Sequence, residues 1–146
     1  MNTYSEMFAF LLQVVAAGQL AIAILNLFLV RLMKWKSDVA RMPLLIREVF
    51  RVHAWFISVT LGIFGVMTWR FADEMSSGTN PIGTWLSVGI GIFWAIRTVL
   101  QITYYSSSHW KGQASRTLIH VTLLVAYGGM AAAYLICGIL GGGTLP

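Results

Sequence analysis

Long apolar runs separated by short polar segments dominate the chain. The stretch "FAFLLQVVAAGQLAIAILNLFLV" carries no charge before Arg31, and three further runs of similar length follow it. A bilayer core about 30 Å thick is crossed by about 20 apolar residues in α-helical conformation, so each run is long enough to span a membrane. The predicted spans are residues 8–33, 49–69, 82–105 and 116–140.

These four spans predict an all-α fold class, a polytopic membrane protein built as an up-down bundle of four transmembrane helices. No segment shows the alternation of a strand, and we expect residues 1–146 to form a single integral membrane domain. Asn80 followed by Pro81 predicts a helix N-cap with proline in the first turn. Small residues at four-residue spacing predict close helix contacts in the second, third and fourth spans: Ser58 and Gly62; Ser87 and Gly91; Gly128, Gly129, Ala132 and Ala133.

Composition agrees with a membrane protein. The chain is 58% hydrophobic and 10% charged, whereas soluble domains are roughly 45–50% apolar and about 25% charged. The single cysteine, Cys137, excludes an internal disulfide and is expected to be a small buried side chain. The net charge of +5 does not imply that the protein binds nucleic acid, because the placement of cations in a membrane protein usually reflects its topology.

The cations gather in two of the three predicted loops. Those between the first and second spans are Arg31, Lys34, Lys36, Arg41 and Arg47, and those between the third and fourth are Lys111 and Arg116. The remaining loop offers Arg70 beside Asp73 and Glu74. By the positive-inside rule both basic loops face the cytoplasm and both termini face outside, in what we expect to be a bacterial inner membrane.

Polar residues inside the spans share one depth. Arg97 lies about 12 Å inside the cytoplasmic end of the third span, with Gln101 one turn nearer that end on the same face. A charge in lipid costs about 2.5 kcal/mol or more. Arg97 therefore either extends to the lipid headgroups or faces inward, where Gln101 and Tyr104 or Tyr105 could help it neutralise a haem propionate, a quinone carbonyl or a lipid phosphate.

Two histidines lie at matching depth near the starts of the second and fourth spans. In an up-down bundle their helices are diagonal neighbours, so His53 and His120 could face each other across the core, and such a pair can ligate a haem b iron from both sides. Each can instead be an interfacial or hydrogen-bonded residue, and pigments of the chlorophyll type also take histidine ligands. His120, Tyr127 and Tyr134 form a stripe at seven-residue spacing, which predicts an inward seam of hydrogen-bonding aromatics.

Three classes of function fit these features. The first is a small integral membrane subunit of a redox or electron-transfer complex, which binds b-type haem or a quinone between the second, third and fourth spans. The second is a cofactor-free structural or accessory subunit, and the third is a minimal transporter or channel. The sequence contains no nucleophile–base pair or phosphate loop, so catalysis by the chain alone is not expected. Expected partners are the lipid bilayer and larger membrane subunits or further copies of the chain.

Overall fold

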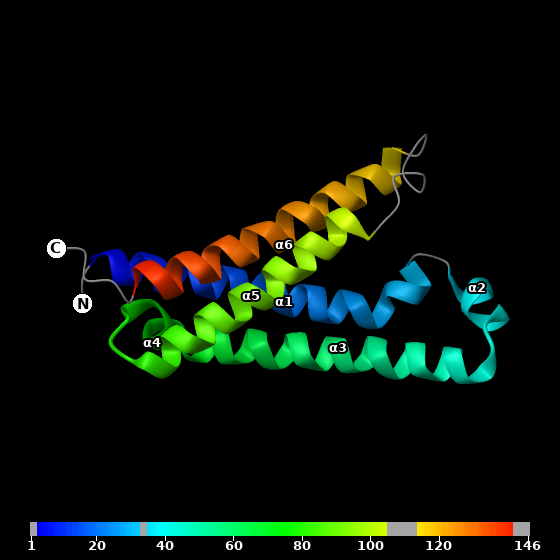
Figure 1. The fold of residues 1–146 in the computed structure, drawn as a ribbon, viewed down its shortest axis with the longest axis horizontal. Helices are drawn as coiled ribbons and strands as arrows, with labels where there is room; N and C mark the ends of the chain where they lie inside the picture. The colour runs from blue at the N-terminus through cyan, green and yellow to red at the C-terminus, as the bar shows by residue number, and fades with distance from the viewer. Residues whose placement is uncertain (1–2, 33–34, 105–113, 142–146) are drawn as a thin grey trace. The chain divides into compact units, whose positions relative to one another are not determined.

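The computed structural model describes residues 3–32, 35–104 and 114–141, and these residues contain helices and no strand. The helices are α1 (Thr3–Leu32), α2 (Lys36–Arg41), α3 (Leu44–Arg70), α4 (Ala72–Ser77), α5 (Pro81–Thr103) and α6 (Ala114–Leu140) (Figure 1). In the described chain, four helical stretches are long and apolar enough to cross a membrane: Thr3–Phe28, Leu44–Arg70, Pro81–Thr103 and Thr117–Leu140. The predicted fold class, an all-α integral membrane protein, is confirmed.

The short segments between the spans contain helix that the sequence analysis did not predict. The second span begins at Leu44 instead of residue 49, because the helical hydrogen bonding starts at Pro43, whose carbonyl accepts from the N–H of Arg47 at 3.0 Å. The turn after Arg70 contains α4, which ends at Gly78 with a left-handed φ of 64°. Glycine suits that position because it has no Cβ to clash.

The predicted start of the third span is confirmed in atomic detail. The Asn80 side-chain oxygen accepts a hydrogen bond from the N–H of Ile82 at 3.0 Å, and Pro81 is the first residue of α5. The cap satisfies a backbone donor that the helix leaves without an internal partner. This boundary is therefore fixed by local chemistry.

The chain forms two compact units. The first comprises Met1–Leu12 and Phe71–Pro146, and the second comprises Gln13–Arg70. In the first unit α5 and α6 lie side by side, with α4 next to the start of α5 (Figure 1). In the second unit α1 lies along α3, and α2 belongs to the connection between them. That residues 1–146 act as a single domain stays a prediction.

Small residues bring α5 and α6 together in the first unit. A Cβ placed on Gly91 would lie 2.8 Å from Cγ of Leu135, and one on Gly138 would lie 2.8 Å from a methyl group of Val88. The buried Ser87 donates its hydroxyl to the Tyr134 carbonyl at 2.9 Å. Because both glycines occupy contacts too close for a larger side chain, they fix how far apart the two helices lie.

In the second unit the close contact falls on a glycine that the spacing did not predict. Gly62 has open space around it, whereas a Cβ on Gly65 would lie 2.8 Å from the Leu20 side chain. The buried Gln19 donates to the Leu61 carbonyl at 3.3 Å. The Gly62 contact is therefore corrected to Gly65, because the face of α3 that meets α1 carries Leu61 and Gly65.

Candidate functional site

One face of α5 and one stripe of α6 supply the most concentrated polar chemistry in the first unit. Their side chains form what we call the α5–α6 polar cluster: Trp94, Arg97, Gln101, His120 and Tyr127. The α5 members are three and four residues apart, so they share a helix face, and the α6 members are two turns apart. Both helices belong to the same compact unit.

The centre of the cluster is a hydrogen bond between Gln101 and His120. Nε2 of Gln101 lies 2.9 Å from Nδ1 of His120. Gln101 is 3% exposed and His120 is half-buried. Both residues were predicted to bind a ligand, but the Gln101 amide was expected to contact the ligand and not the imidazole.

The orientation of the Gln101 amide sets which ring nitrogen of His120 carries the proton. With the amide nitrogen toward the ring, Nδ1 accepts and the proton of the neutral ring lies on Nε2. In that state Nε2–H is a hydrogen-bond donor, and neither ring nitrogen offers a lone pair to a metal. The geometry therefore favours a ligand that accepts a hydrogen bond.

Turning the Gln101 amide over exchanges the donor and acceptor roles of Gln101 and His120. Oε1 of Gln101 is buried and, in the described part of the chain, has no hydrogen-bond partner. If it took the place of the amide nitrogen, Nδ1 of His120 would donate to it and Nε2 would keep its lone pair. Metal-binding histidines commonly use this second arrangement. The orientation of the buried Gln101 amide thus decides whether His120 acts as a hydrogen-bond donor or as a metal ligand.

Arg97 packs on the aromatic part of the cluster. Its guanidinium carbon lies 4.8 Å from the centre of the Tyr127 ring, and that ring stacks on Trp94 with centroids 5.2 Å apart and planes at 28°. A cation over an aromatic face contributes about 0.5–1 kcal/mol when exposed and about 2 kcal/mol when desolvated. Arg97 therefore contacts protein on α6, and its expected neutralisation of an anion stays a prediction.

The sequence predicted only some of the aromatic residues of the cluster. Tyr127 and Tyr134 are 6% and 0% exposed, so the inward direction expected of these two side chains is confirmed, while hydrogen bonding by their hydroxyls stays a prediction. Trp94 was not predicted as a site residue, although its spacing of three from Arg97 and seven from Gln101 could have indicated it. The expected small buried role of Cys137 also holds, since the residue is 0% exposed.

The other predicted site residues lie outside the cluster. His53 is exposed on α3 in the second unit, and Tyr104 is 82% exposed at the end of α5. The pairing of His53 with His120 joins the two units and stays a prediction. Tyr105, the other expected companion of Arg97, falls outside the described residues. Within the described ranges, no three His, Cys, Asp or Glu side chains gather as a metal site.

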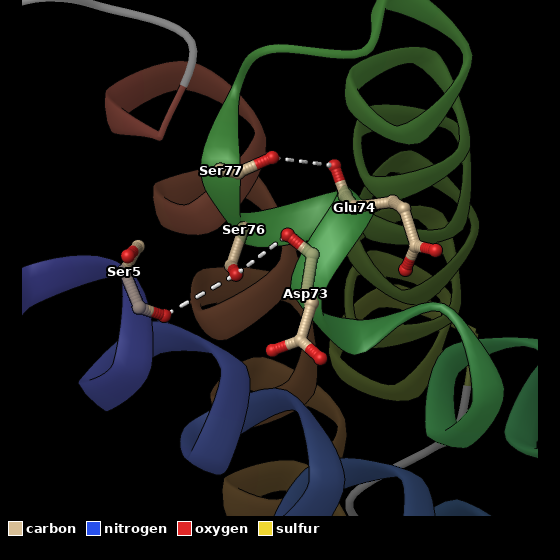
Figure 2. A pocket seen from close by; sticks show the side chains of 5 residues that line it. All are labelled: Ser5, Asp73, Glu74, Ser76 and Ser77. Atoms are coloured by element: carbon tan, nitrogen blue, oxygen red, sulfur yellow. Dashed lines mark hydrogen bonds between the residues drawn. The ribbon is translucent and has the colours of Figure 1, made fainter. Parts of the chain in front are cut away.

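A second polar feature lies at the opposite end of α5. A hollow of about 240 Å³ is lined by Ser5, Asp73, Glu74, Ser76 and Ser77 (Figure 2). The Ser76 hydroxyl is within hydrogen-bond distance of the carbonyls of Ser5 and Asp73, at 3.3 and 3.1 Å, and the Ser77 hydroxyl is 3.4 Å from that of Glu74. The hydroxyls of Ser76 and Ser77 thus lie at backbone carbonyls, and we assign the hollow to the local packing of α4.

The α5–α6 polar cluster is thus the candidate functional site, defined by its own residues. Comparison of the chain with protein-family models, with curated proteins and with solved structures finds no match.

Proposed function

We propose that the protein is a small integral membrane subunit of a redox complex, and that the α5–α6 polar cluster binds the headgroup of a quinone. The observation that carries this proposal is the Gln101–His120 hydrogen bond, which makes Nε2–H of His120 a donor. A quinone dissolves in the bilayer and presents carbonyl oxygens that accept hydrogen bonds. His120 is half-buried, so part of its side chain is exposed to a ligand arriving from lipid.

Arg97 supports the same ligand class through its charge. It lies about one turn from Gln101 on the same face of α5, and Tyr127 holds its guanidinium against α6. Reduction of a quinone adds negative charge to its oxygens, and a nearby cation stabilises that charge more strongly in a medium of low dielectric constant than in water. The cluster thus combines a donor for the oxidised headgroup with a cation that favours its reduction.

Quinone binding can be measured directly in lipid nanodiscs. A benzoquinone with a decyl chain is titrated against the purified protein, and quenching of tryptophan fluorescence gives the Kd. Replacing His120 by Phe removes the donor, and we expect about a tenfold weaker Kd, the equivalent of roughly 1.4 kcal/mol. Thr103→Val is the matched control, because the Thr103 hydroxyl is used by the carbonyl of Val99 at 2.9 Å. Equal affinity in all three proteins would contradict the proposal.

Haem b is the second candidate, because the turned-over Gln101 amide would place a lone pair on Nε2 of His120, as an iron ligand requires. In that case the purified protein shows a Soret band and a sharp alpha band on reduction, and both His53→Ala and His120→Ala abolish them. A colourless protein that binds no quinone and co-purifies with larger membrane subunits would instead support the cofactor-free accessory role. Solute flux in liposomes would be the evidence for a transporter.

A further inference from the structure

The connection between α1 and α3, together with the start of α3, carries more cations than carboxylates. We call residues 35–51 the α2 corner; its cations are Lys36, Arg41, Arg47 and Arg51. It also contains Asp38 and Glu48, yet among the described residues none of the four cations forms an ion pair. The corner therefore presents positive charge that the described chain does not neutralise.

Arg47 is the best-positioned of these cations. Its Nη1 lies 3.5 Å from the carbonyl of Ala40, which is among the last carbonyls of α2 and has no partner within that helix. Its Nε is buried and has no hydrogen-bond partner in the described part of the chain. The side chain thus ties α2 to the first turn of α3, and because Nε is buried, an external ligand has to reach Arg47 through its Nη atoms.

The surroundings of Arg47 are apolar and exposed. Leu44, Leu45 and Ile46 are 61%, 71% and 55% exposed, and Trp35 at the start of the corner is 38% exposed. Because the corner joins two helices of membrane-spanning length, it lies where headgroups meet the acyl chains. Indole side chains are favoured at this interface, leucine side chains can contact the acyl chains, and exposed cations attract anionic headgroups.

We propose that the α2 corner binds the phosphodiester headgroup of an anionic phospholipid, with Arg47 as the principal contact. A guanidinium offers a planar fork of donors that matches two phosphate oxygens. Arg51 lies one helical turn along the same face of α3 and adds charge. Leu44 and Leu45 contact the acyl chains of the same lipid. A free phosphate ion would match the cations but would leave the apolar side chains without a partner.

Native mass spectrometry of the full chain released from detergent tests this proposal. The probes are dioctanoyl phosphatidylglycerol, dioctanoyl phosphatidylcholine and inorganic phosphate. We expect phosphatidylglycerol to bind about tenfold or more tightly than phosphatidylcholine, because both carry a phosphodiester but the choline ammonium cancels the net charge and is repelled by the cations of the corner. We also expect millimolar inorganic phosphate to leave the lipid bound.

Three variants locate the site. Arg47→Gln should lower phosphatidylglycerol affinity about tenfold, and Arg47→Lys should give an intermediate loss because it keeps the charge without the fork. Arg70→Gln, at the other end of α3, removes one positive charge away from the corner and should leave the affinity unchanged. Circular dichroism checks that each variant keeps its helix content.

Three results would overturn the proposal. Equal affinity for the two lipids would remove the headgroup preference. An unchanged affinity in Arg47→Gln would remove the principal contact, and displacement of the lipid by inorganic phosphate would make the site a phosphate site. If Arg47→Gln does not fold, the combined variant Lys36→Gln, Arg41→Gln and Arg51→Gln takes its place, and unchanged affinity there would equally overturn the proposal.

Discussion

The tautomer of His120 is the most direct prediction of the candidate site. In the native protein the Gln101 amide donates to Nδ1 across 2.9 Å, so we expect the ring proton on Nε2. With the amide held in this orientation only one tautomer can form the hydrogen bond, and a bond between neutral partners contributes about 1 kcal/mol net, which corresponds to roughly a fivefold population ratio. Since Gln101 is 3% exposed, water does not compete strongly for the amide. We therefore expect the tautomer with the proton on Nε2 to outnumber the other by at least this ratio.

Two substitutions of Gln101 move the tautomer in different ways. Gln101→Leu removes the donor, and the ring should become a mixture of tautomers. Gln101→Glu, measured at alkaline pH where the carboxylate is ionised, provides only acceptors, so the ring proton should move to Nδ1. Each change affects a single buried contact, and we expect a loss of unfolding free energy of about 1–3 kcal/mol for the unpaired imidazole in Gln101→Leu.

The assay is ¹⁵N NMR of histidine-labelled protein. The chain has three histidines, so replacing His53 and His109 by Gln leaves His120 as the sole signal. Nδ1 should have the shift of an unprotonated nitrogen in the native protein and that of a protonated one in Gln101→Glu. Thr103→Val should match the native spectrum. A protonated Nδ1 in the native protein would refute the donor role of Gln101, and it would favour the haem candidate over the quinone.

Three further predictions concern packing and topology. Gly91→Val should destabilise the protein by about 1–3 kcal/mol in a thermal melt, because the added atoms meet a leucine of α6, whereas Gly89→Val should have little effect because the space around that glycine is open. Arg97→Leu should lower the unfolding free energy by about 0.5–2 kcal/mol through loss of its aromatic contact, and an unchanged melting temperature would point to an arginine held by headgroups. In a cysteine-free background, Ala40→Cys should react with impermeant maleimide from the cytoplasmic side and Thr79→Cys from the other; the reverse pattern would invert the topology.

The sequence by itself determined the membrane-spanning helices and one of their boundaries. Span length follows from bilayer thickness, and the apolar runs satisfy it without reference to any partner helix. The Asn80 cap is equally local, because its side chain reaches a backbone N–H two residues away. The inward stripe of Tyr127 and Tyr134 was predictable as well, since large polar aromatics are costly to leave unpaired in lipid. In each case the deciding interaction lies within one helix or between a helix and the bilayer.

The tertiary structure decided which face each helix turns toward its neighbour. It selected Gly65 instead of Gly62 for the contact with α1, and it joined Gln101 to His120 instead of to an external group. Sequence periodicity gives the depth of a residue along a helix well, but several rotations of an apolar helix bury similar area against similar lipid-like surfaces. The choice among them depends on contacts such as that between Gly91 and Leu135, which are distant in sequence and form only when two helices pack. Orientation of the site residues is therefore a property of the packed helices, whereas their depth is already set by the chain.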